Sequence, residues 1–365
     1  MKFSINKDEI IHQLQSLAAV ADKKQTLPIL SNIYLKCSGD ELILKSTDLE
    51  VELEFKLTAQ NSEDGETTIP SKKISDIVRE LPEGEIAFSL NDDGNKMQVK
   101  SSSGRYNLAT ISAGDFPDFD TVPSDKTYDI SSDDLLALIQ KTSFAMANQD
   151  WRHYLNGCLL QKNMNEVNMV ATDAHRLAVY KLKLDQEGDF FGIIPRKTII
   201  ELTKILPKNN EQIQFYINAN NIVFMYKNFT FKSKLVDGNY PDFTKVIPSG
   251  DGLEIGVNRK SLIETLSRVS VLSSEKFKGV KLKTNENSLE VSAHNPDQES
   301  AEESLNIVSG SAPGFDVAFN VNYLREVLAT IDDDEIKLIS FGTDKSALIE
   351  GSDKQQTLVL MPLLL

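Results

Sequence analysis

Hydrophobic and polar positions follow one pattern three times along the chain, at a spacing of about 125 residues. The clearest part is a set of apolar positions separated by three, one and three residues, which describes one face of an amphipathic helix. The three sets are Ile74, Ile77, Val78 and Leu81, then Ile199, Leu202, Thr203 and Leu206, then Leu324, Val327, Leu328 and Ile331. A period of this length is a whole domain, so the pattern predicts three similar domains, at 1–122, 128–248 and 252–365.

Each repeat is predicted to contain two helices and several antiparallel strands, which makes the fold class α+β. Alternating segments such as NIYLKC and VELEFKL predict strands, and turns rich in Gly, Asn and Asp separate them. Pro70 and Pro195 are expected in a first helical turn, where the missing N–H costs nothing. Asn6, Ser131 and Asn258 are expected to cap the first helices. The predicted helices cover residues 7–21, 72–81, 132–147, 196–206, 259–272 and 322–330.

The composition is that of an ordinary globular protein, with 40% hydrophobic and 25% charged residues among 365. The apolar run LVLMPLLL is far shorter than the ~18 residues that a membrane-spanning helix needs. Cys37 and Cys158 fall in different repeats and are interpreted as core thiols. These features predict a cytoplasmic protein.

The formal charge of −15 argues at first against nucleic-acid binding, which normally requires a basic surface. The charge is unevenly distributed, however. The six predicted helices carry twelve basic and nine acidic residues, whereas the rest of the chain carries 27 basic and 45 acidic residues. Basic pairs stand at two repeated helix starts, Lys72 with Lys73 and Arg196 with Lys197. Two interpretations of this small excess remain open. One is a basic helical face, and the other is the ordinary mixed charge of helix surfaces.

Motifs of catalysis are mostly missing from the sequence. There is no phosphate-binding loop, no dinucleotide fingerprint and no nucleophile elbow, and the four histidines are scattered without metal-ligand spacing. The acidic run from Asp332 to Glu335 matches helix-to-strand turns in the other repeats. We therefore interpret it as a solvated turn rather than a metal site.

One constellation, ATDAHRLA, allows a catalytic hypothesis. Asp173 and His175 are alternate residues, which share a face on a strand, and would form an acid and base pair. Against this, no serine or cysteine lies in a nucleophile motif, and the equivalent Asp48 has no histidine beside it. A structural role for Asp173 in its turn and a binding role for His175 and Arg176 are the alternatives.

Together with the repeat, a series of motifs in order closely resembles the family of bacterial DNA polymerase III β subunits, the sliding clamps. The motifs run from MKFSINKDEIIHQL through LPILSNIYL, TDLEVE, ANQDWRHYLNG, TDAHRLAV, IPRK, YPDF, LSSEKFKGV and FNVNYL to VLMPLLL. The resemblance implies three clamp domains per chain in a closed dimeric ring that encircles double-stranded DNA. It implies a processivity factor without catalysis or cofactors, which tethers DNA polymerase III through its alpha subunit and is loaded by a clamp loader complex. Other polymerases and repair proteins would share the same peptide-binding pocket.

The resemblance also implies the residues of that pocket. Two positions depart from the family pattern, Ala174 where glycine is common and Lys245 where arginine is common, and both bear on the pocket's shape. The final LVLMPLLL is expected to be a buried strand, a pocket wall, or both. The pocket residues are Leu155, Thr172, His175, Arg176, Leu177, Pro241, Val246, Val359, Met361, Pro362 and Leu363.

Two further sets of residues follow from the resemblance. Those expected to contact DNA are Lys24, Gln149, His153, Tyr154, Arg196 and Lys197, with His153 standing where tyrosine is often found. Those expected at the dimer interface are Tyr106 and Leu108 against Val271 and Leu272. An enzyme that uses Asp173 and His175, and a repeat-built adhesion or scaffold protein, remain the competing hypotheses.

Overall fold

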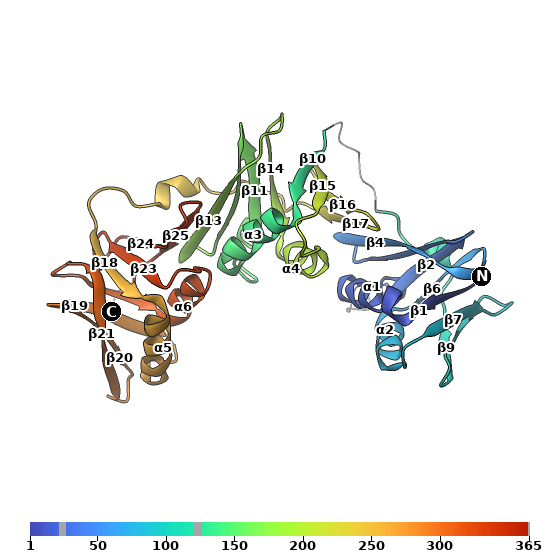
Figure 1. The fold of residues 1–365 in the computed structure, drawn as a ribbon, viewed down its shortest axis with the longest axis horizontal. Coiled ribbons are helices and arrows are strands. Elements are labelled where there is room, and N and C mark those ends of the chain that lie inside the picture. The colour runs from blue at the N-terminus through green and yellow to red at the C-terminus, as the bar shows by residue number, and fades with distance from the viewer. Residues whose placement is uncertain (22–26, 120–125, 277, 364–365) are drawn as a thin grey trace. The chain divides into compact units, whose positions relative to one another are not determined.

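The computed structural model describes residues 1–21, 27–119, 126–276 and 278–363 (Figure 1). The chain divides into two compact units. Unit 1 consists of Met1–Asp133 and Lys197–Leu235, and unit 2 consists of Asp134–Arg196 and Val236–Leu365. The boundary between the units therefore passes through the central repeat.

The first repeat has two α-helices that lie side by side against its strands (Figure 1). Its helices are α1 (Lys7–Val20) and α2 (Ser71–Glu80), with 3₁₀ turns η1 (Pro28–Ser31) and η2 (Ala113–Asp115). Its strands are β1 (Lys2–Asn6), β2 (Asn32–Ser38), β3 (Glu41–Thr47), β4 (Val51–Thr58), β5 (Gln60–Glu63), β6 (Gly65–Pro70), β7 (Glu85–Leu90), β8 (Lys96–Lys100) and β9 (Arg105–Ala109).

Apart from β5, which has no counterpart among its described strands, the central repeat keeps the order of helices and strands of the first. Its helices are α3 (Ser132–Thr142) and α4 (Arg196–Ile205), with η3 (Ser143–Ala145), η4 (His153–Leu155) and η5 (Phe243–Val246). Its strands are β10 (Tyr128–Ser131), β11 (Gly157–Asn163), β12 (Glu166–Thr172), β13 (Arg176–Lys183), β14 (Phe190–Pro195), β15 (Gln212–Ile217), β16 (Asn221–Tyr226) and β17 (Phe229–Lys234).

The third repeat again pairs two helices, α5 (Arg259–Val269) and α6 (Val321–Ala329), with the 3₁₀ turn η6 (Ser270–Leu272) after α5. Its strands are β18 (Leu253–Asn258), β19 (Gly279–Asn285), β20 (Ser288–His294), β21 (Ser300–Gly310), β22 (Asp316–Asn320), β23 (Glu335–Ser340), β24 (Ala347–Glu350) and β25 (Gln356–Leu360).

Antiparallel pairing makes the sheets continuous from one repeat into the next. In unit 1, β17 pairs with β4 within an eight-stranded sheet, and a five-stranded sheet is formed by β5, β1, β7, β8 and β9. In unit 2, β13 pairs with β25 within a twelve-stranded sheet. The central repeat therefore gives half of its strands to each neighbour.

The predicted helices are confirmed, with differences at their ends that have local causes. Pro70 and Pro195 are the last residues of β6 and β14, so each ends a strand directly before its helix and does not occupy the first helical turn as predicted. At Asn258, the side chain accepts the N–H of Ser261 at 2.9 Å, as expected of a helix cap. The predicted helices 132–147 and 259–272 each finish in a separate 3₁₀ turn.

Both cysteines are free and buried in the cores, and burial raises the pKa of the Cys158 thiol to about 12. Among the described helices, none combines the length and apolar character required to cross a bilayer.

Candidate binding site

Unit 2 contains a cavity of about 300 Å³ with mainly apolar walls, which we call the apolar cavity. It opens beside the pairing of β13 with β25 and is bordered by η4, η5 and the turn between β12 and β13. The structure brings together eight residues of the predicted pocket here: Leu155, Thr172, Arg176, Leu177, Pro241, Val246, Val359 and Met361.

The floor of the apolar cavity is buried, and its rim is exposed. Leu177 and Val359 are register partners across the two strands, and each is only 2% exposed. Both belong to a core cluster that also packs against Phe243 and Tyr240, and burial raises the pKa of the Tyr240 phenol. Val246 and Met361 at the rim are 50% and 41% exposed. An apolar floor with an accessible rim suits a short apolar segment of another molecule.

Hydrogen bonds hold the turn from Thr172 to Arg176 at the edge of the cavity. Thr172 Oγ1 donates to the carbonyl of Arg176 at 2.6 Å and accepts the N–H of Ala174 at 3.1 Å. Ala174 adopts φ of 75°, in the left-handed region, which costs a non-glycine residue roughly 1 kcal/mol. A glycine would adopt this conformation without that cost, so Ala174 holds the turn with a small strain.

Arg176 ties this turn to two other segments of unit 2. Its Nε donates to Asp173 Oδ2 at 3.1 Å and its Nη2 to the carbonyl of Phe144 at 2.8 Å, while Nη1 pairs with Glu326. Its guanidinium also lies 4.5 Å from the ring centre of Tyr323. The structure thus gives Arg176 a structural role in addition to its place in the cavity wall.

The same geometry accounts for Asp173 and His175. One carboxylate oxygen of Asp173 accepts the backbone N–H groups of His175 and Arg176, and the other accepts from the Arg176 side chain. The His175 ring stacks on Tyr323, with 5.9 Å between ring centres. Asp173 therefore organises the turn, as the structural alternative expected.

Replacing Arg176 with alanine is expected to lower the free energy of unfolding by about 3 kcal/mol, because it leaves the mostly buried Asp173 carboxylate without its charged partner. The measurement is urea unfolding followed by circular dichroism, together with a calorimetric melting curve. Arg325→Ala is the matched control, since Arg325 is exposed on the same helix as Glu326 and its loss should cost less than about 0.5 kcal/mol. Equal stabilities of the two variants would contradict the structural role.

A second depression lies beside the apolar cavity, and we call it the polar hollow. Its volume is about 620 Å³, and Arg152 and Arg176 border both spaces. Arg152 is held by two hydrogen bonds to the carboxylate of Asp150, at 3.0 and 2.8 Å, and this pairing lowers the pKa of Asp150 to about 2. Gln149 and His175 line the hollow together with Trp151, which is 82% exposed.

Three residues of the predicted pocket lie outside the lining of the apolar cavity. His175 belongs to the polar hollow, and Pro362 and Leu363 continue past β25, where the N–H of Leu363 donates to the carbonyl of Ala318 at 2.8 Å. Lys245 also lies outside the lining and pairs with Asp242 at 3.3 Å. The terminal segment is therefore both a buried strand, up to Leu360, and a cavity wall at Met361.

Five residues of the lining are absent from the predicted pocket set: Arg152, Tyr154, Ala174, Asp242 and Phe243. Of these, Ala174 was named only for its effect on the pocket's shape. Tyr154 was expected at DNA instead. The repeated motif YPDF contained a signal, because Asp242 and Phe243 directly follow the predicted Pro241. For Arg152 the sequence carries no comparable signal, since only the loop between α3 and β11 brings it to the rim.

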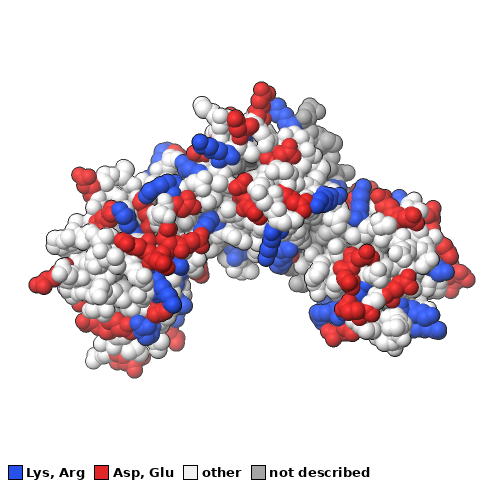
Figure 2. Space-filling model, in the orientation of Figure 1, with Lys and Arg blue, Asp and Glu red and all other residues white. Residues whose placement is uncertain are grey.

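The residues predicted to contact DNA have different surroundings. Gln149 and His153 are exposed, and the N–H of Arg196 donates to the carbonyl of Asn156 at 3.0 Å. The ammonium group of Lys197 donates to Asp48 Oδ2 and to the carbonyl of Val20, both at 2.6 Å, so it already has two partners. Lys24 lies outside the described residues. On the visible face of each unit, acidic and basic side chains are interspersed (Figure 2).

The residues predicted at the dimer interface combine exposed and buried positions. On β9, Tyr106 is 38% exposed and Leu108 is 7% exposed. Val271 in η6 is 78% exposed, and Leu272 beside it is half-buried.

The acidic run after α6 forms an irregular turn with its own contacts. Asp332 pairs with Lys141 at 2.6 Å, and Asp333 accepts the N–H and hydroxyl of Ser352, which lowers the pKa of its carboxyl. Among the described residues there is no cluster of three or more His, Cys, Asp or Glu side chains that suits a metal ion.

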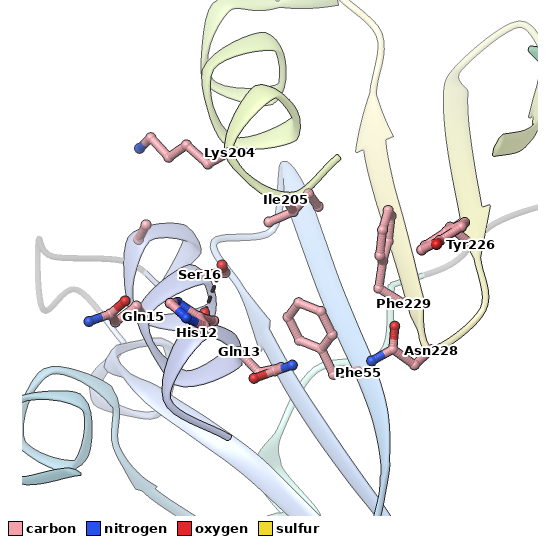
Figure 3. Close-up of a pocket in the computed structure, with 11 residues that line it drawn as sticks. His12, Gln13, Gln15, Ser16, Phe55, Lys204, Ile205, Tyr226, Asn228 and Phe229 are labelled. Atoms are coloured by element: carbon pink, nitrogen blue, oxygen red, sulfur yellow. Dashed lines mark hydrogen bonds between the residues drawn. The ribbon is translucent and has the colours of Figure 1, made fainter. Parts of the chain in front are cut away.

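Unit 1 holds a separate cavity of about 440 Å³ between α1, β4, the end of α4 and the hairpin of β16 and β17 (Figure 3). Gln13 and Phe55 point toward each other at its edge, and the hydroxyl of Ser16 donates to the carbonyl of His12 at 2.9 Å. None of the predicted site residues lines this cavity, and we assign it no role.

Known protein families match the chain as three consecutive domains, one for each repeat. Family models of the DNA polymerase III beta subunit match residues 1–120 as its N-terminal domain, 129–242 as its central domain and 244–364 as its C-terminal domain. The beta sliding clamp of Pseudomonas putida is 38% identical, with both chains covered completely.

Solved structures agree with the sequence relatives. A sliding clamp of Pseudomonas aeruginosa, the DNA polymerase III subunit beta bound to griselimycin, is 37% identical with a TM-score of 0.95, and both chains are covered completely. The DNA polymerase sliding clamp of Bacillus subtilis is 28% identical with a TM-score of 0.92, covering 100% of this chain and 99% of that chain. With its three repeats, its continuous sheets and these full-length matches, the chain belongs to the DNA polymerase III beta subunit family, the beta sliding clamps.

Proposed function

We propose that two copies of this chain close into a ring around duplex DNA and tether DNA polymerase III to it. The observation that carries the proposal is the state of the sheet edges. Each junction between repeats pairs the last strand of one repeat with the fourth major strand of its neighbour, as in β17 with β4 and β25 with β13. In the same scheme, β9 is the last strand of the first repeat and β21 is the fourth strand of the third repeat. These two strands have no neighbouring repeat within the chain to pair with in this way.

Those two strands retain open edges within the described part of the chain. β9 stands at the end of its sheet and pairs only with β8. From Ser300 to Asn306, β21 pairs with β20 alone, and β18 joins it only beyond that stretch. An open strand edge is a template for pairing with another chain. In a dimer, β9 of each copy would pair with β21 of the other. The two identical junctions would fill both open edges and close the ring.

The predicted interface residues fit this arrangement. Tyr106 and Leu108 lie on β9 itself, and Val271 and Leu272 lie in η6, which packs against β20 and β21. An exposed side chain such as Val271 gains burial when the edges meet.

The apolar cavity is the proposed site for partners. Short apolar segments of the polymerase alpha subunit, of the clamp loader complex and of other polymerases and repair proteins would enter it, with His175 and Pro362 contacting the same peptides outside the cavity. Its apolar floor and exposed rim support this role. A tethered polymerase meets the primer end again at high effective concentration, which explains processivity without catalysis or a cofactor.

DNA is retained by encirclement, with weak contacts from Lys24, Gln149, His153, Tyr154, Arg196 and Lys197. The net charge of −15 supports this mechanism, because tight sequence-independent phosphate binding needs a basic surface. A cytoplasmic location is part of the proposal and is supported by the two free, buried cysteines.

The test of encirclement uses nicked circular DNA. The labelled protein is loaded with clamp loader and ATP, free protein is removed, and the circle is cut once. We expect the protein to leave the linear product by sliding over its ends, while it stays on the uncut circle. Retention on linear DNA, with release governed by salt alone, would indicate ordinary phosphate binding and contradict the ring.

A further inference from the structure

Unit 1 contains a cavity of about 280 Å³ whose lining residues each have a counterpart in the lining of the apolar cavity of unit 2. We call it the counterpart cavity. It is lined by Thr47, Leu49, Pro117, Asp118, Phe119 and Lys234. The repeated motif DFPDF supplies three of these residues, as NYPDF supplies Pro241, Asp242 and Phe243 to the apolar cavity.

The turns that border the two cavities are built alike. Thr47 Oγ1 donates to the carbonyl of Val51 at 2.8 Å and accepts the N–H of Leu49, as Thr172 does with residues 176 and 174. One carboxylate oxygen of Asp48 accepts two backbone N–H groups, as that of Asp173 does. Leu49 has φ of 74°, against 75° for Ala174.

Strand pairing establishes the remaining correspondences. The N–H of Lys234 donates to the carbonyl of Glu50 at 2.9 Å, and the N–H of Met361 donates to that of His175 at 2.8 Å. Lys234 is therefore the counterpart of Met361. In the same register, the pair Glu52 and Lys232 occupies the positions that Leu177 and Val359 hold in unit 2, although neither Glu52 nor Lys232 is among the residues that line the counterpart cavity.

The two cavities differ in chemistry at these positions. Glu52, which is 2% exposed, forms an ion pair with Lys232 at 2.7 Å, and burial raises the pKa of its carboxyl. Lys234 replaces a thioether at the rim and pairs with Glu50 at 3.2 Å. Leu49 replaces the small Ala174. An apolar side chain entering here would cover the exposed Lys234 ammonium without offering it hydrogen bonds, and it would not meet the apolar pair that Leu177 and Val359 provide in unit 2.

We propose that Glu52, Lys232 and Lys234 are specificity-determining residues that exclude apolar partner peptides from the counterpart cavity and restrict each chain to one partner site. This inference rests on the proposed function of the apolar cavity. The repeat would otherwise provide two equivalent peptide sites per chain.

The first experiment converts the counterpart cavity into an apolar one. The variant carries Leu49→Ala, Glu52→Leu, Lys232→Val and Lys234→Met, and the probe is a labelled synthetic pentapeptide containing two leucines and a phenylalanine. Isothermal titration should give one peptide per chain for the original protein and two for the variant. A variant with unchanged circular dichroism and solution mass that still binds one peptide overturns the inference, as does binding of two by the original protein. Failure of the original protein to bind at all overturns the proposed function instead.

The reciprocal experiment remains decisive if the first variant does not fold. Leu177→Glu with Val359→Lys installs the ion pair in the apolar cavity, in a register that already supports it elsewhere in the chain. Affinity for the pentapeptide should fall by roughly 100-fold or more, since charged groups then face the apolar ligand. Binding like that of the original protein would show that the ion pair does not exclude apolar peptides.

Discussion

Replacing Met361 with glutamate is expected to weaken binding of the polymerase alpha subunit by roughly 100-fold, which corresponds to about 3 kcal/mol. Met361 lines the apolar cavity and is 41% exposed, so the free protein can keep the new carboxylate in water. A bound apolar peptide covers that position and leaves the charge without a partner. Surface plasmon resonance with immobilised alpha subunit measures the change.

Met164→Glu is the matched control for this substitution. Met164 is 84% exposed in the turn between β11 and β12 and does not line the cavity, so the same change of side chain should leave affinity unaltered. A Met361→Glu protein that binds the alpha subunit as tightly as the original protein would remove the apolar cavity from partner binding. Equal losses in both would point to a general effect of the added charge.

Replacing Val271 with aspartate is expected to raise the dissociation constant of the dimer by about 100-fold or more, because the closed interface would bury an unpaired carboxylate. The 78% exposure of Val271 means that the folded monomer should tolerate the change. Sedimentation velocity over a range of concentrations measures the dissociation, and the loading assay on nicked circles should show loss of retained protein.

For the interface, Met164→Asp is the control, since it adds the same charge at an exposed methionine that belongs to none of β9, β21 and η6. A Val271→Asp protein that remains dimeric at nanomolar concentration would refute the proposed pairing of β9 with β21. Unchanged thermal stability of the monomer is required for either conclusion.

Local patterns were sufficient for most of the secondary structure. Apolar spacing located the helices, because a buried face must recur every three to four residues wherever the helix lies. The preference of proline for a first helical turn misplaced Pro70 and Pro195, which are the last residues of β6 and β14. A proline directly before a helix and a proline within its first turn have the same sequence pattern, and only strand pairing with β2 and β11 distinguishes them.

The candidate site was only partly predictable. Leu155, Leu177 and Val359 were expected from the family resemblance and do line the cavity. Arg152 and Phe243 were missed as pocket residues, because segments distant in sequence bring them to the same rim. His175 was expected in the pocket but lies in the polar hollow, since its turn directs it toward Tyr323.

By itself, the sequence determined the threefold repeat, the α+β class, the helix positions and the family, because each depends on residue order and spacing. The tertiary structure decided which repeated positions carry different chemistry. Leu177 and Glu52 are 125 residues apart in the equivalent strands β13 and β4, and their equivalence is visible in the sequence. Only strand pairing shows that Val359 stands opposite Leu177 and Lys232 opposite Glu52, so that equivalent strand positions carry an apolar pair in unit 2 and a buried ion pair in unit 1. The physical reason is that a cavity's polarity depends on side chains from two strands, and their register forms only when the chain folds.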